Sequence, residues 1–111
     1  RPPRDARWHD VLLDPEQEVH VSVVSLWEMA LKSRIGKLDI DLGQVERICD
    51  EAGFRPLAIL PPHLQALRAL PQVEDHRDPF DHLLIAQAIA EGLVFLTADR
   101  RAARYPVRLL P

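Results

Sequence analysis

Residues 76–105 (HRDPFDHLLIAQAIAEGLVFLTADRRAARY) limit the fold more than any other stretch, because helix and strand signals follow one another closely there. A helix is predicted to begin at Asp78-Pro79, since proline at the first helical position has no intrahelical hydrogen bond to lose. Apolar residues then recur at helical spacing, and Gly92 is predicted to end the helix. Residues 93–96 form a continuous apolar run, which is typical of a strand covered on both faces of a parallel sheet.

Two acids stand at the ends of these predicted elements. Asp81 lies in the first turn of the helix, and Asp99 follows the strand through Thr97. In an open α/β sheet, ligands bind outside the carboxyl ends of the strands. We therefore expect Asp99 to lie where chemistry would occur, with Asp81 at the head of the preceding helix.

The rest of the chain also alternates between strand and helix patterns. Strands are predicted at residues 19–23, 54–59 and 107–110, and helices at about residues 4–13, 25–35, 42–52 and 61–70. Such alternation predicts an α/β fold, with a central, mostly parallel sheet flanked by helices. A length of 111 residues suits one domain.

Composition excludes some classes of protein. No apolar run reaches the roughly 18–20 residues that span a membrane. The single cysteine, Cys49, cannot form an internal disulfide, which fits a reducing compartment and a cytoplasmic location. A net charge of −3 means that any nucleic-acid contact must use local basic groups. The candidates are Arg77, Arg100, Arg101 and Arg104, which could equally be solvated helix faces.

Each acid of interest has a structural explanation as well as a functional one. Glu28 completes a capping-box pattern that begins at Ser25, and it precedes Lys32 by four residues, a favourable helix pair. Asp78 could cap the helix that carries Asp81, whose carboxylate would be favoured by the helix dipole. Asp99 could cap the segment that follows it.

Taken together, the three acids Glu28, Asp81 and Asp99 point to chemistry. Glu28 lies near the start of a helix that follows a strand, Asp81 at the start of another helix, and Asp99 at the end of a strand. In a parallel sheet these points can converge at one edge. Carboxylates gathered in one place repel one another unless a cation neutralises them. Hard oxygen ligands select Mg²⁺ or Mn²⁺, and such ions can activate water against a phosphodiester. This pattern does not separate a nuclease from a metal-dependent phosphatase.

Three segments, residues 21–38, 76–93 and 94–110, resemble the PIN-domain ribonucleases, and most closely the VapC-type toxins of bacterial toxin–antitoxin pairs. The resemblance implies a three-layer fold and an endoribonuclease that hydrolyses RNA with Mg²⁺ or Mn²⁺. It also implies a homodimer that a VapB-like antitoxin inhibits. Its metal ligands would be Glu28, Asp81 and Asp99, with Thr97 orienting a carboxylate or the attacking water.

The family usually begins with a strand that ends in an aspartate, and no such segment is present here. Asp5, Asp10 and Asp14 follow no apolar strand run. We therefore expect residues 1–111 to form a single PIN-like domain that lacks its first strand. Two alternatives stay open: an inactive PIN-like module that binds RNA or an antitoxin, and a phosphatase, which would need a nucleophilic aspartate on that strand.

Other residues have simpler interpretations. Trp27 is predicted to pack in the core, as are the regularly spaced Leu42, Val45 and Cys49. His76 and His82 flank the acids without a convincing metal-site partner in the sequence, and both are interpreted as solvated or helix-capping.

Overall fold

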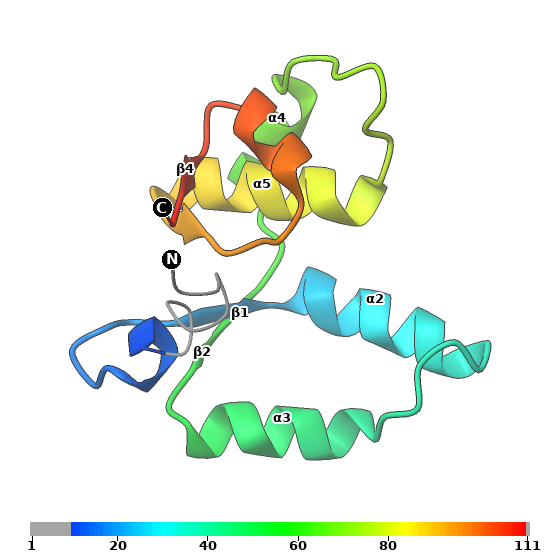
Figure 1. The fold of residues 1–111 in the computed structure, drawn as a ribbon, viewed down its shortest axis with the longest axis vertical. Coiled ribbons are helices and arrows are strands. Elements are labelled where there is room, and N and C mark those ends of the chain that lie inside the picture. The colour runs from blue at the N-terminus through cyan, green and yellow to red at the C-terminus, as the bar shows by residue number, and fades with distance from the viewer. Residues whose placement is uncertain (1–9, 111) are drawn as a thin grey trace. The chain divides into compact units, whose positions relative to one another are not determined.

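The computed structural model describes residues 10–110, which divide into two compact units at the Leu57–Ala58 junction. Both units combine helices with parallel strands, as Figure 1 shows. The predicted α/β fold class is confirmed. Within residues 10–110, no helix is both long and apolar enough to cross a membrane.

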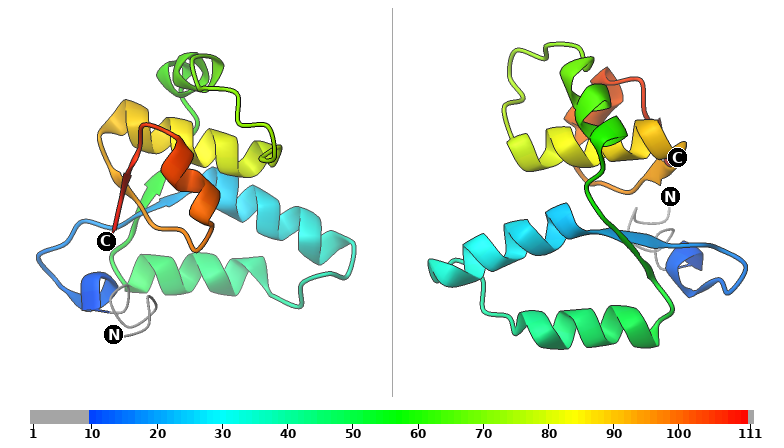
Figure 2. Two further views of the ribbon diagram at one scale, coloured as in Figure 1. Left: turned by 45° about the horizontal axis from the view of Figure 1, so that its top comes forward. Right: turned by 180° about the vertical axis from the view of Figure 1, so that it is seen from behind.

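In the first unit, two helices connect a pair of parallel strands. A helical segment at residues 10–13 ends before Asp14, while the start of the predicted 4–13 helix lies outside the described residues. The elements that follow are β1 (His20–Ser22), α2 (Val23–Arg34), α3 (Leu42–Glu51) and β2 (Arg55–Leu57). In the β1–β2 pair, His20 lies opposite Arg55 and Ser22 opposite Leu57. The long connection through α2 and α3 allows these strands to run parallel (Figure 2).

Local capping determines where α2 begins. The Ser22 hydroxyl accepts a hydrogen bond from the Val24 backbone N–H at 3.0 Å, so the helix starts directly after β1. The predicted capping box at Ser25 is therefore wrong, because Ser25 already lies inside the helix. The predicted pair is confirmed, since Lys32 Nζ lies 3.0 Å from a Glu28 carboxylate oxygen.

The second unit contains α4 (Pro61–Arg68), α5 (Pro79–Glu91), β3 (Val94–Phe95), the 3₁₀ helix η1 (Arg100–Arg104) and β4 (Arg108–Leu109). Helix α4 packs against α5, and β3 pairs with β4 in parallel. The predicted buried strand is shorter than expected, and Val94 is 47% exposed. The prediction of cover on both faces is wrong because β3 has only two residues, which pair in this unit with β4 alone.

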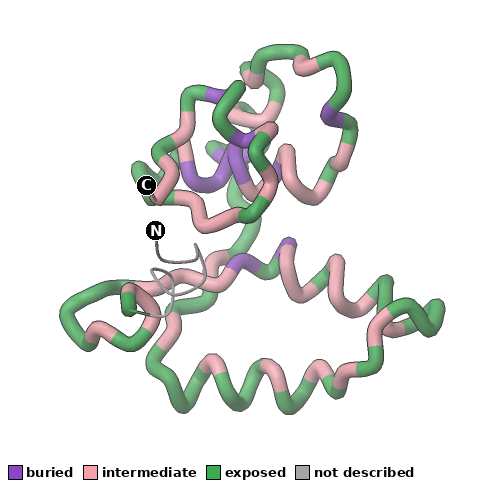
Figure 3. The backbone as a smooth tube through the Cα atoms, in the orientation of Figure 1, coloured by how far each residue is buried: buried purple, intermediate pink, exposed green. Residues whose placement is uncertain are grey.

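The buried core lies mainly in the second unit, as Figure 3 shows. Ile85, Ala102 and Tyr105 form its centre, and partly buried apolar side chains of residues 70–109 pack around them. In residues 10–57, only Ser22 and Val24 are buried.

Two core predictions in the first unit are wrong. Trp27 is 50% exposed, because apolar residues lie around much of α2 and only part of that surface is covered. Helix α3 contains no buried residue, and Leu42, Val45 and Cys49 are only half-buried on its inner side.

Candidate metal centre

The start of α5 fixes the position of the Asp81 carboxylate. Asp78 is the N-cap, and its carboxylate accepts hydrogen bonds from the backbone N–H groups of Phe80 at 2.9 Å and Asp81 at 3.4 Å. Pro79 occupies the first helical position, as predicted. Asp78 therefore serves as a cap, and Asp81 projects from the first turn of the helix.

Asp99 is held by the turn that leaves β3. The Thr97 hydroxyl accepts a hydrogen bond from the Asp99 backbone N–H at 3.1 Å, and Asp99 then caps η1 by accepting from the Arg101 backbone N–H at 2.9 Å. Thr97 thus supports Asp99 through the backbone. The element after Asp99 is a 3₁₀ helix, and the predicted cap is confirmed.

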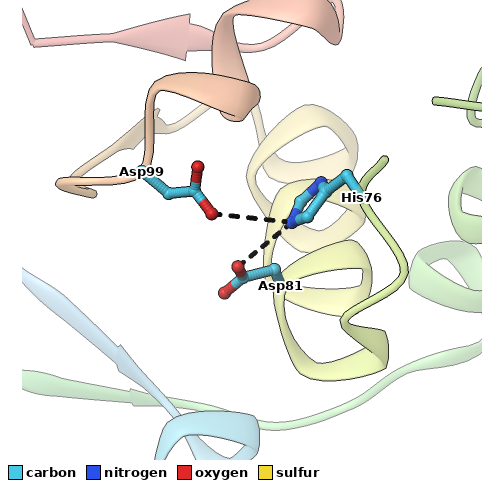
Figure 4. A group of neighbouring side chains, drawn as sticks. All are labelled: His76, Asp81 and Asp99. Carbon is cyan, nitrogen blue, oxygen red and sulfur yellow. Dashed lines mark hydrogen bonds and ion pairs between the residues drawn. The ribbon is translucent and has the colours of Figure 1, made fainter. Parts of the chain in front are cut away.

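His76 joins the two acids, as Figure 4 shows. Its Nε2 lies 3.2 Å from Asp81 Oδ2 and 3.8 Å from Asp99 Oδ2. Its Nδ1 lies 2.9 Å from the Tyr105 hydroxyl oxygen. The residue is only 2% exposed, so the prediction of a solvated histidine is wrong. A buried imidazole needs polar partners, and the folded chain supplies them from α5, the turn before η1 and Tyr105, which directly follows η1.

His82, the other histidine beside the acids, supports the loop that carries His76. Its Nε2 lies 2.8 Å from the His76 carbonyl oxygen and can donate to it. The two rings meet edge to face, with centroids 4.9 Å apart. His82 is half-buried, and its hydrogen bond positions the backbone of His76. This differs from the predicted solvated or helix-capping role.

Arg101 is the counter-charge of Asp99. Its Nε donates to both carboxylate oxygens, at 3.1 and 3.2 Å, and its Nη2 donates to Oδ2 at 2.8 Å. Its Nη1 also donates to the Asp75 carbonyl oxygen at 2.8 Å. The side-chain hydrogen bonds from Arg101, followed by its backbone N–H, lower the pKa of Asp99 to about 2. Asp99 is therefore an anion throughout the neutral range.

Tyr105 closes the buried side of the cluster. Burial raises the pKa of its hydroxyl above the ordinary value, so the phenol stays protonated and can donate as well as accept. The side chain is 5% exposed and belongs to the core of the second unit.

The cluster has the donor atoms of a divalent-cation site. His76 Nε2 and one oxygen from each of Asp81 and Asp99 lie within 4.8 Å of one another. The two carboxylates are 23% and 26% exposed, whereas the imidazole is buried. A cation could thus reach the carboxylates from solvent. Carboxylate oxygen and imidazole nitrogen are both established ligands of divalent metals, so these residues fit such an ion.

The structure brings together two of the three predicted acids. Asp81 and Asp99 meet in the second unit, while Glu28 lies on α2 in the first unit and pairs with Lys32. Sequence reasoning missed His76 as a member of the cluster and Arg101 as the partner of Asp99. The available signal was the position of His76 in the short loop before the Asp78 cap, which turns back toward the first turn of α5.

Comparison with known proteins gives one match at the family level. The model of the PIN domain family matches residues 1–107, nearly the whole chain. A search of curated proteins gives no match. PIN domains are generally metal-dependent nucleases that bind divalent ions, which agrees with the donor set of the cluster.

Proposed function

The chain belongs to the PIN domain family, and from this premise we propose that it is a divalent-metal-dependent endoribonuclease, the toxin of a VapC-type toxin–antitoxin pair. The observation that carries the proposal is the meeting of Asp81 and Asp99, which are 18 positions apart in the sequence and come from different elements. The acidic motifs resemble those of such toxins, and two of their three acids lie in one cluster.

In this proposal the acids have distinct tasks. Asp81 and Asp99 supply oxygen ligands for Mg²⁺ or Mn²⁺. Glu28 is a ligand only as the resemblance of residues 21–38 implies. Thr97 holds the turn that aims Asp99. When bound, the ion would activate a water molecule and offset the charge that develops on the phosphodiester.

Arginines beside the cluster suit an RNA substrate despite the net charge of −3. The Arg101 side chain is 41% exposed while it pairs with Asp99, and Arg77 and Arg100 are exposed. Arg104 pairs with Asp75. A few local cations that contact phosphates make affinity fall as salt rises, so RNA binding should weaken between low and physiological salt.

A matched pair of variants tests the role of Asp99. Asp99→Asn removes the charge but keeps an oxygen that can cap η1. We expect cleavage of single-stranded RNA in Mg²⁺ or Mn²⁺ to fall by about 100-fold or more, because several kcal/mol of metal-dependent stabilisation is lost. Chelation of the ion should have the same effect.

Asp78→Asn is the control, because asparagine also caps helices well and Asp78 lies outside the cluster. The assay should use the protein expressed from its complete reading frame. Unchanged cleavage by a folded Asp99→Asn protein would remove Asp99 from the mechanism.

One observation favours a second candidate function, an inactive PIN-like module that binds RNA or an antitoxin. Arg101 already neutralises Asp99 through several hydrogen bonds, as an ion otherwise would. The same assay distinguishes the candidates. If the wild-type protein binds RNA but does not cleave it in either Mg²⁺ or Mn²⁺, the inactive binding module is favoured.

We also propose the assembly that the resemblance implies: a cytoplasmic homodimer inhibited by a VapB-like antitoxin. Helix α2 and its C-cap residue offer exposed apolar side chains for a protein contact, namely Val23, Trp27, Leu31 and Ile35. Light scattering of the purified protein should give the mass of a dimer. A monomer mass at micromolar concentration would contradict the proposed assembly.

A further inference from the structure

We propose that His76 is itself a ligand of the divalent ion, through Nε2. The site would then be a mixed nitrogen–oxygen site that favours ions such as Zn²⁺ or Co²⁺ over Mg²⁺. This inference rests on the proposed metal dependence and assigns a ligand other than the three acids. Mg²⁺ prefers oxygen donors alone, whereas imidazole nitrogen strengthens binding of the later first-row metals.

The position of His76 is the first support. Figure 4 shows its Nε2 directed toward both carboxylates. The separations of 3.2 Å from Asp81 Oδ2 and 3.8 Å from Asp99 Oδ2 are those of ligands that share one ion, since two ligands bonded at about 2.1 Å can be no more than about 4.2 Å apart. The nitrogen thus lies on the buried side of the cluster, opposite the solvent-facing acids.

The second support is the way in which the ring is held. Tyr105 contacts Nδ1 through its hydroxyl at 2.9 Å, and His82 holds the His76 carbonyl. In metal-bound histidines the N–H of the second ring nitrogen usually donates to a fixed acceptor, which sets the tautomer and the ring orientation. The Tyr105 hydroxyl oxygen is placed to be that acceptor.

Ligation requires a defined change of tautomer. In the tautomer that carries the proton on Nε2, Nε2–H donates to Asp81 and Nδ1 accepts from the Tyr105 hydroxyl. To bind an ion, Nε2 must offer its lone pair, so the ring proton moves to Nδ1 and is donated to the Tyr105 oxygen. The Tyr105 hydroxyl can take either role, so the ring stays neutral and no proton is gained or lost by the pair.

His63 provides an internal comparison in the same unit. It is fully buried, and its Nε2 lies 2.8 Å from a Glu91 carboxylate oxygen. Its Nδ1 accepts from the Leu60 backbone N–H, which fixes its tautomer. His63 thus pairs with a carboxylate but belongs to no group of three potential ligands among residues 10–110.

The test is ¹⁵N NMR of the histidine rings of the full-length protein during titration with Zn²⁺, which is diamagnetic. We expect His76 Nε2 to lose its proton and its resonance to shift, while His76 Nδ1 gains the proton. The resonances of the His63 ring should stay unchanged. Unchanged His76 resonances at saturating Zn²⁺ would overturn the proposal, as would the absence of Zn²⁺ binding. RNA cleavage with Mg²⁺ in the same preparation would leave the proposed nuclease function standing in either case.

Variants allow a second measurement, the ratio of Zn²⁺ affinity to Mg²⁺ affinity determined by calorimetry. This ratio would not change if His76 had only a structural role. His76→Gln should lower Zn²⁺ affinity by about 100-fold and Mg²⁺ affinity much less, so the ratio falls. Tyr105→Phe retains the buried ring and the histidine, and it should lower Zn²⁺ affinity by about 10-fold. His63→Gln should leave the ratio unchanged. A folded Tyr105→Phe protein with wild-type Zn²⁺ affinity would contradict the proposed proton acceptor.

Discussion

At the scale of the residue, Asp99 makes three contacts that have different effects on its carboxylate. It caps η1, it pairs with Arg101, and its Oδ2 faces His76. The first two contacts hold the carboxylate in place and keep it ionised. The pairing with Arg101 also competes with any cation at the cluster, because both need the same oxygens. Arg101 is therefore the residue whose removal should change the electrostatics of the site most directly.

Arg101→Ala should raise the pKa of Asp99 from about 2 toward its ordinary value of 3.8, because the strongest hydrogen bonds to the carboxylate are lost. The measurement is a ¹³C titration of the carboxyl carbon. A lowered pKa in the folded state contributes stability that is present above the unfolded-state pKa and is lost as pH falls toward about 2. The variant should therefore lose less stability than the wild type between about pH 4 and pH 2.

Arg104→Ala is the control, since Arg104 pairs with Asp75 and not with Asp99. An Asp99 pKa that is equal in the wild type and in Arg101→Ala would show that Arg101 does not hold the carboxylate in solution.

At the scale of the element, both ends of α5 are fixed by local signals. Asp78 and Pro79 begin it, Gly92 ends it, and its buried residues include Leu83, Ile85 and Ala86. Gly92 has φ 68°, and Leu93 N–H donates back to the Ala88 carbonyl oxygen at 2.8 Å. This left-handed ending turns the chain from the helix into β3, which leads to Asp99.

Gly92→Ala should lower the free energy of unfolding by about 1–2 kcal/mol, because a Cβ is unfavourable in the left-handed region. Space does not add to this cost, since the nearest atom to an added Cβ is Arg108 Nη2 at 3.8 Å. Urea unfolding measures the change. Gly92→Asn is the matched variant and should lose less stability, because asparagine tolerates this conformation better. Equal stability of all three proteins would show that the helix ending contributes little.

At the scale of the whole molecule, burial is uneven. The second unit has a buried cluster around Ile85 and Tyr105, whereas in residues 10–57 only Ser22 and Val24 are buried. Each unit contains a sheet of two parallel strands. Such small sheets depend on packing against helices for their stability. The described part of the chain therefore has one well-packed region, and it is the region that holds the candidate metal centre.

Hydrogen exchange should reflect this difference. Amides in the middle of α5 should exchange markedly more slowly than those of α3, because the middle of α5 is buried at Leu83 and at residues 85–88 whereas α3 contains no buried residue. The measurement is hydrogen–deuterium exchange of the purified protein at neutral pH, followed by mass spectrometry. Equal protection of the two helices would mean that α3 is covered in solution by a surface outside the described contacts.

Local signals in the sequence determined the two ends of α5 and the positions of the two acids near the ends of elements. Asp78-Pro79 and Gly92 mark the two ends of α5, and the structure places both as predicted. The alternation of strands with helices predicted the α/β class. These signals succeed because a cap or a left-handed ending depends only on a few neighbouring residues. The presence of Asp81 and Asp99 near element ends followed from the same local reasoning.

Tertiary structure alone decided which side chains meet and which are buried. The partners of His76 include Tyr105, 29 positions away, and no local pattern specifies that contact. The short length of β3 and the exposure of Trp27 likewise depend on what packs against them. Burial and polar pairing are properties of residues brought together from distant parts of the chain. For this reason the sequence located the acids of the candidate site, and only the folded structure could add the histidine and the arginine that complete it.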